Sequence, residues 1–254
     1  MNFEKILEHH LMDHAYFPLF SLGGLRLAFS KHLLVMWAVS AFVVAMLAAA
    51  ARGRSGAGLL LRTGVEAVAL YIRDRMLRPI FGHATETYLP YFLSLFFFIL
   101  CCNLAGLIPE SASVTGNISV TAALAACTFA LIQFAGVREQ GLFSYLAHIA
   151  PGGLPMPLVP LIFTIEVLGL LAKCVALCIR LFANMIAGHI VSLAFLSLIF
   201  IFAQMSPYVG LGVAPAAVGL ALFVYALDVL IALLQAYIFT FLTALFVGGA
   251  VHPH

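Results

Sequence analysis

The stretch LLAKCVALCIRLFANMIAGHIV (170–191) decides the fold class, because it is long and apolar enough to cross a membrane yet carries an arginine near its middle. A transmembrane helix needs about 20 predominantly apolar residues. A guanidinium stays protonated in proteins, and estimates of the cost of placing it at a bilayer centre range from about 2.5 to more than 10 kcal/mol. Intramembrane charges usually face a water-filled cavity or an ionic partner. Arg180 is therefore a candidate functional residue.

The whole chain has the composition of a membrane protein. Of its 254 residues 64% are apolar and 9% are charged, whereas about 25% charged is usual in soluble domains. The mean hydropathy is +1.14. Several separate apolar runs of sufficient length predict an all-α polytopic membrane protein, embedded in the lipid bilayer as a single membrane domain over 1–254. The formal charge of +2, without a basic tail, argues against nucleic-acid binding.

Residues 1–32 are expected to form a short surface segment on the outer side, because Gly23-Gly24 breaks any long helix. No continuous apolar region precedes a small-residue cleavage site, so no cleaved signal peptide is expected. His9, His10 and His14 lie close together, and the last two have the i, i+4 spacing of metal ligands. An interfacial helix that carries polar residues explains them more simply, so no metal site is predicted.

The first transmembrane helix is expected over residues 33–51, and a basic segment follows it over 52–87. By the positive-inside rule this segment lies on the cytoplasmic side. Apolar residues alternate with arginines at helical intervals and predict an amphipathic helix along the membrane surface, with a solvated loop as the alternative. Six of the twelve Lys and Arg residues fall here, namely Arg52, Arg54, Arg62, Arg73, Arg75 and Arg78.

A transmembrane hairpin is expected over 88–109 and 118–137, and the segment PGGLPMPLVP (151–160) then breaks the chain. Two long helices follow, over 157–205 and 214–251. About 40 residues make a helix of about 60 Å, twice the thickness of the hydrocarbon core. Such helices tilt steeply, break, or both, and steep tilting is expected here. The predicted topology places the N-terminus outside and the C-terminus inside.

The first long helix carries the ionisable residues Glu166, Lys173, Arg180 and His189 besides its cysteines. At 100° per residue, Glu166 and Lys173 lie within about 40° of Arg180, so these three share one face, and His189 points about 180° away from Arg180. The shared face is typical of the wall of an aqueous path or of a charged contact surface.

The second long helix carries Asp228 and Gln235, seven residues apart and hence about 20° apart in direction. If the two long helices are antiparallel neighbours, His189 approaches Asp228 and the two form a protonatable pair. Gln235 then lies closer to the level of Arg180.

Internal ion pairing is the structural alternative for these charges. Glu166 is about 21 Å from Arg180 along the helix axis, too far for a direct pair. Asp228 is a possible partner, but that pairing leaves Glu166 and His189 without a role. Intramembrane ionisable residues usually mark transport paths, so we favour transport. The cysteines lie in apolar runs without a completed ligand set and are interpreted as small hydrophobic residues, namely Cys101, Cys102, Cys127, Cys174 and Cys178.

Four blocks of sequence carry a family resemblance: RLFANMIAGHI (180–190), NLAGLIP (103–109), LLQAYIFTFLTALFV (233–247) and TGNISVTAALA (115–125). With them the chain resembles subunit a of the rotary F-type ATP synthases over most of its length. The resemblance implies a non-catalytic stator subunit of a proton-translocating rotary ATP synthase, without a cofactor of its own. It implies two offset half-channels that load and unload carboxylates of the rotating c-ring, so that proton flow is coupled to ATP synthesis.

The resemblance also assigns roles to residues. Arg180 takes the place of the essential stator arginine that faces the c-ring carboxylates, and Asn184 and Gln235 match the polar residues that support it. His189 and Asp228 match the inlet-side pair. Two further residues complete the implied proton paths, Asn103 on the inlet side and Glu166 on the other side.

The sequence departs from a common bacterial pattern, in which an acid stands at the position of His189 and a histidine at that of Asp228. The pair is swapped and its chemical content kept, which favours direct contact. Ala183 stands where Gly is usual, and Cys174 stands where Pro commonly follows a basic residue such as Lys173.

The implied partners are the c-ring and the peripheral-stalk b subunits. The implied location is a bacterial plasma membrane, with an organellar inner membrane as the alternative, and the c-ring decides whether H⁺ or Na⁺ is carried. A secondary transporter that binds an anionic substrate at Arg180 is the alternative function, although no repeated halves are found in the sequence. A membrane scaffold without an ion path is disfavoured by the five intramembrane charges.

Overall fold

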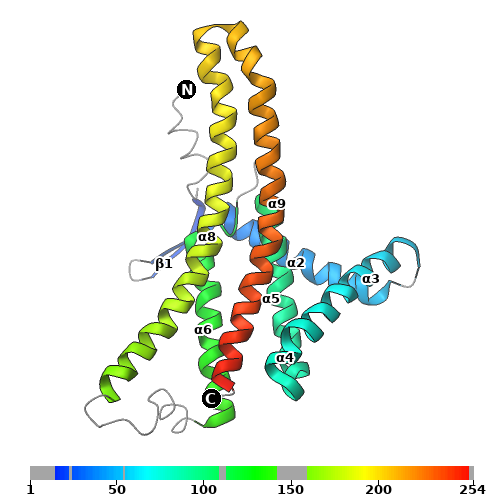
Figure 1. Ribbon diagram of the computed structural model, residues 1–254, viewed down its shortest axis with the longest axis vertical. Coiled ribbons are helices and arrows are strands. Elements are labelled where there is room, and N and C mark those ends of the chain that lie inside the picture. The colour runs from blue at the N-terminus through cyan, green and yellow to red at the C-terminus, as the bar shows by residue number, and fades with distance from the viewer. Residues whose placement is uncertain (1–14, 23–24, 54, 109–112, 142–158, 252–254) are drawn as a thin grey trace. The chain divides into compact units, whose positions relative to one another are not determined.

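The computed structural model describes residues 15–22, 25–53, 55–108, 113–141 and 159–251. Figure 1 shows that most of these residues form helices. They are α2 (Lys31–Arg52), α3 (Gly56–Tyr71), a π-helix (Ile72–Leu77), α4 (Arg78–Phe81), a 3₁₀ turn (Gly82–Ala84), α5 (Thr85–Gly106), α6 (Ile118–Gln140), α8 (Val159–Met205) and α9 (Pro207–Val251).

Five helical stretches among the described residues are long and apolar enough to cross a membrane. The predicted class, an all-α polytopic membrane protein, is therefore confirmed. α8 has 47 residues and α9 has 45, which correspond to lengths of about 70 Å each. Their steep tilt in the bilayer stays a prediction. The five stretches are Lys31–Arg52, Gly56–Gly106, Ile118–Gln140, Leu161–Gln204 and Tyr208–Val251.

A small β-hairpin lies within residues 1–32, for which only a short surface segment was expected. Strand β1 (Ala15–Leu22) pairs antiparallel with β2 (Leu25–Ser30), with Leu22 opposite Leu25. The two residues between the strands in the sequence are Gly23 and Gly24, which lie outside the described residues. His9, His10 and His14 lie outside the described residues.

α9 begins at Pro207, earlier than the start expected at 214. Proline is favoured at the first position of a helix, where its missing N–H is not needed, and Pro215 is accommodated inside α9. Only Ser206 separates the end of α8 from the start of α9. The two helices are therefore joined by a tight reversal at Ser206 rather than by the connection over 206–213 that the expected helix bounds leave.

The described chain divides into two compact units. Unit 1 comprises Met1–Met46, Phe97–Asn117 and Leu181–Ala236. Unit 2 comprises Leu47–Phe96, Ile118–Arg180 and Tyr237–His254. The boundaries between the two units fall inside α5, α8 and α9, so each unit contains a part of each of these helices.

In unit 1 the parts of α8 and α9 nearest the connection pack as an antiparallel hairpin. A Cβ added at Gly210 would lie 2.7 Å from the Cα of Ala203, so the two helices meet closely beside the turn. The end of α5 is joined to α9 by two hydrogen bonds. Asn103 Nδ2 donates to the carbonyl of Ala232 at 3.2 Å, and the Tyr225 hydroxyl donates to the carbonyl of Leu107 at 3.0 Å.

In unit 2 three contacts connect α6, the first part of α8 and the last part of α9 with one another. Thr121 Oγ1 lies 3.4 Å from Cys178 Sγ, between α6 and α8. Gln140 Nε2 donates to the carbonyl of Ala250 at 2.6 Å, between α6 and α9. Lys173 Nζ lies 5.5 Å from the ring centroid of Phe246, in cation–π range.

Unit 2 also contains the predicted amphipathic segment, which is helical rather than a loop. α3 buries none of its residues and exposes large apolar side chains, Leu60 at 76% among them. A helix that exposes apolar side chains has the composition of a membrane-surface helix. Its position on the membrane surface stays a prediction.

Candidate functional site

α8 presents three distinct faces, and its charged residues occupy one of them. The packed face consists of the five buried residues Cys174, Leu177, Cys178, Leu181 and Met185. On an ideal helix Arg180 points about 120° from the centre of this packed face. Large exposed apolar side chains lie on the other flank, about 100° to 180° from the packed face, and include Leu161, Ile165, Leu168, Val175 and Ile179.

The charged face of α8 contains Glu166, Lys173, Arg180 and Asn184, all within about 40° of one another. Glu166 and Lys173 are exposed, whereas Arg180 and Asn184 are half-buried. Asn184 follows Arg180 by four residues in the sequence. The charges are therefore separated from the apolar flank that suits lipid tails.

The carboxylate of Asp228 on α9 packs directly against the backbone of α8 at Gly188. A Cβ added at Gly188 would lie 2.6 Å from both carboxylate oxygens of Asp228. Real Cβ atoms do not approach so closely, so the arrangement requires glycine here. Both residues belong to unit 1 and both are half-buried. The structure thus brings Asp228 to the residue that precedes His189, while direct contact between His189 and Asp228 stays a prediction.

Asn103 of α5 packs its buried amide against α9 near Asp228. Its side chain is 1% exposed, and Nδ2 donates to the carbonyl of Ala232, one turn beyond Asp228. Within the described part of the chain, Asn103 Oδ1 is buried without a hydrogen-bond partner. A buried acceptor of this kind usually binds an ordered water or ion. Asn103 therefore fixes α9 with one atom and offers a polar site with the other.

Gln235 is buried in the same stripe of α9, one turn after Ala232. Unit 1 contains five of the predicted site residues, namely Asn103, Asn184, His189, Asp228 and Gln235. The two remaining predicted site residues, Glu166 and Arg180, belong to unit 2.

Sequence reasoning missed Gly188 as part of the site. A glycine in the middle of a long helix is a signal, because it weakens the helix and is tolerated where another group approaches closely. The same helix also contains Gly169, which has open space at its Cβ position. Sequence alone therefore does not distinguish the glycine that meets Asp228 from the one that meets nothing.

No group of three or more His, Cys, Asp or Glu residues gathers as a metal site within the described ranges. The five cysteines are free thiols, and Cys102, Cys174 and Cys178 are buried.

Comparison with known proteins identifies one family over most of the chain. A family described as "ATP synthase A chain" matches residues 33–248. The chain is 38% identical to "ATP synthase subunit a" of Chloroherpeton thalassium, over 96% of this chain and 75% of that protein. It is 43% identical to "ATP synthase subunit a" of Anaeromyxobacter dehalogenans (strain 2CP-1), over 91% of this chain and 59% of that protein. A third relative, "ATP synthase subunit a" of Chlorobium phaeobacteroides, is 40% identical over 96% of this chain and 74% of its own length.

Proposed function

Because the chain belongs to the ATP synthase A chain family, we propose that its two long helices form the proton-conducting stator surface of an F-type ATP synthase. One observation carries this proposal: the Asp228 carboxylate packs on Gly188 beside His189, on a membrane helix whose separate charged face holds Arg180. A titratable histidine and a permanent charge on α8, with a carboxylate of α9 packed beside the histidine, suit a device that moves protons and blocks their direct passage.

The inlet path is proposed to use His189, Asp228 and Asn103. An imidazole changes its protonation between about pH 5 and 8, and a neighbouring carboxylate can exchange a proton with it. The buried acceptor Oδ1 of Asn103 is suited to hold a water on α9 one turn from Asp228. These residues come from α5, α8 and α9 of unit 1.

Arg180 is proposed to separate the inlet path from the outlet path. A guanidinium cannot release its proton, so it stabilises the ionised form of a carboxylate that arrives beside it and repels a proton that attempts direct crossing. Asn184 and Gln235 carry amides that can donate and accept hydrogen bonds, and they are proposed to orient Arg180 and the arriving group.

Glu166 is proposed to accept the proton on the outlet side. It lies on the charged face of α8, fourteen residues before Arg180, or about 21 Å along the axis. Its side chain is exposed, which permits exchange with water.

The proposed partners are a ring of subunits that carry membrane carboxylates, the c-ring, and the peripheral-stalk b subunits. The chain is a multi-pass membrane protein, and the bacterial origin of its relatives supports a bacterial plasma membrane as its location. The carried ion is proposed to be H⁺.

Replacement of the arginine tests the function. In the assembled complex in sealed vesicles, Arg180→Ala is expected to abolish ATP synthesis driven by an imposed gradient while passive proton leak through the membrane sector persists. Ile179→Ala is the matched control, because Ile179 neighbours Arg180 but lies on the exposed apolar flank at 52% exposure. Coupled synthesis at the normal rate in Arg180→Ala contradicts the proposal.

A further inference from the structure

A polar pocket lies where the chain turns into the second apolar helix, away from the residues proposed for proton transport. Its cavity of about 430 Å³ is lined by residues between Arg73 and Glu86, from the π-helix through α4 and the 3₁₀ turn to the first turn of α5. This volume falls within the range of about 300 to 1,000 Å³ that small-molecule sites occupy. Because all lining residues belong to one continuous segment of unit 2, that segment alone forms the pocket.

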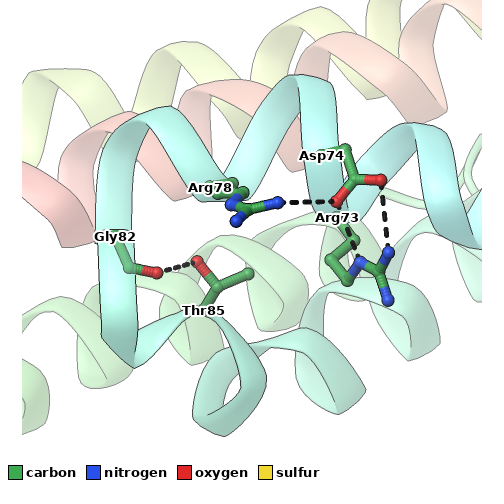
Figure 2. Close-up of polar contacts among 5 residues, drawn as sticks. All are labelled: Arg73, Asp74, Arg78, Gly82 and Thr85. Carbon is green, nitrogen blue, oxygen red and sulfur yellow. Dashed lines mark hydrogen bonds and ion pairs between the residues drawn. The ribbon is translucent and has the colours of Figure 1, made fainter.

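The backbone of the pocket is held in place by packing and by one left-handed residue. Gly82 has φ +53°, a conformation that favours glycine, and it reverses the chain between α4 and α5. Thr85 Oγ1 donates to the carbonyl of Gly82 at 2.7 Å, as Figure 2 shows. Phe81 is 2% exposed and stacks on Tyr88 at 4.7 Å. A site built on such a fixed turn loses little conformational entropy when a ligand binds.

Two arginines of the pocket share the carboxylate of Asp74, and a second carboxylate, that of Glu86, lines the same cavity. Arg73 donates to both carboxylate oxygens of Asp74, at 2.9 and 3.2 Å. Arg78 lies 3.9 Å from Asp74, at the edge of ion-pair range, and its side chain is 73% exposed. Figure 2 shows both guanidinium groups directed at this one carboxylate. Glu86, in the first turn of α5, lines the same cavity. Among the described residues Glu86 has no ion pair, and Arg78 keeps most of its side chain exposed beside its one long contact with Asp74, so both can contact a ligand.

We expect the pocket to lie at the depth of membrane headgroups, because it precedes the apolar part of α5. The apolar part of α5 begins directly after Glu86, within a stretch long enough to cross the membrane. On the other side of the pocket, α3 exposes Leu60 at 76% and Leu70 at 41%. Charged side chains beside the start of a span lie among phospholipid headgroups, and exposed leucines beside them can contact acyl chains.

We propose that this pocket binds the headgroup of a phospholipid that carries a primary ammonium beside its phosphodiester, as in phosphoethanolamine lipids. Arg78 binds the phosphate oxygens, because a guanidinium forms short charge-assisted bonds to phosphate. Glu86 binds the ammonium. A purely anionic headgroup leaves the carboxylate of Glu86 without a counter-charge, whereas a zwitterion offers a phosphate to Arg78 and an ammonium to Glu86.

The test compares retained lipid in variants of the complete complex. The complex is reconstituted in nanodiscs with equal phosphatidylethanolamine and phosphatidylglycerol, extracted, and its bound lipids are counted by mass spectrometry. Retained phosphatidylethanolamine is expected to exceed phosphatidylglycerol and to fall about tenfold or more in Arg78→Gln. Glu86→Gln is expected to remove the preference between the two headgroups. Arg75→Gln is the matched control, because Arg75 is exposed on the same π-helix but does not line the cavity.

Two results overturn the proposal: wild-type retention in Arg78→Gln, or an equal loss in Arg75→Gln, which indicates general surface charge. A third arm distinguishes the source of the phosphate group. If millimolar inorganic phosphate displaces the lipid as well as glycerophosphoethanolamine does, the pocket recognises a phosphate group alone and the lipid proposal is wrong. The inference does not depend on the proposed transport path. If Arg78→Gln loses the lipid but keeps proton-coupled ATP synthesis, the two sites are separate.

Discussion

Gly188→Ala is the sharpest test of the arrangement between α8 and α9. The added methyl would lie 2.6 Å from both oxygens of Asp228 and 2.7 Å from its Cγ, whereas ordinary contact begins at 3.4 Å. The carboxylate therefore has to move by about 0.8 Å, the difference between 3.4 and 2.6 Å. Because this carboxylate ends a flexible side chain, it can rotate away at a modest cost in stability. Its distance to a proton donor then changes.

The expected effect is on the rate of proton transfer rather than on assembly. A misplacement of about 1 Å at a reacting group can reduce a rate about a hundredfold. We expect ATP synthesis driven by an imposed gradient in inverted vesicles to fall between about tenfold and a hundredfold, at an unchanged amount of assembled complex. Gly169→Ala on the same helix is the control, because a Cβ there meets nothing within 4 Å, and its synthesis rate should be normal.

A double substitution determines whether the effect passes through Asp228. If the methyl at position 188 acts only by displacing the carboxylate, Gly188→Ala should cause no further loss in an Asp228→Ala background. A normal rate in the single variant, or the same fractional loss in both backgrounds, refutes the reasoning.

Three further predictions follow from the same contacts. His189→Ala and Asp228→Ala are expected to slow gradient-driven proton uptake non-additively, and additive losses in a double-mutant cycle mean that the two side chains act separately. Asn103→Leu removes the 3.2 Å bond to α9 and the buried acceptor, so uptake should slow and unfolding free energy should fall by about 1 kcal/mol, measured by vesicle acidification and thermal melting. Gly248→Ala brings a methyl into Ile80 and should destabilise the fold by about 1–3 kcal/mol in thermal melting, whereas Gly249→Ala, with open space at its Cβ, should not.

The sequence predicted the helices and the charged face of α8 because both depend on local periodicity. Apolar runs of sufficient length identified the membrane helices, and the 100° rotation per residue grouped Glu166 and Lys173 with Arg180. The burial pattern of α8 agrees with this grouping, because its packed residues lie on a different face.

The contact between Gly188 and Asp228 was beyond sequence reasoning for a physical reason. It depends on the register between two helices, and the register is determined by where the chain reverses. The expected helix bounds leave a connection over 206–213, whereas the structure reverses at Ser206 and continues the helix through Pro215. The β-hairpin at Ala15–Ser30 was missed for a related reason, because strand pairing is a non-local interaction that helix-breaking glycines only permit.

Because only Ser206 connects α8 and α9, the number of residues between this turn and Asp228 determines which part of α8 the carboxylate faces. In an antiparallel hairpin, residues at similar distances from the turn lie near each other, and Gly188 and Asp228 lie 18 and 22 residues from Ser206, a difference of about one helical turn. A single residue inserted into α9 between the turn and Asp228 turns the carboxylate by about 100° and moves it by about 1.5 Å. A residue inserted beside Ser206 itself extends only the loop. We therefore expect an insertion at the turn to preserve the contact between Gly188 and Asp228, and an insertion within the helices between these two residues to break it.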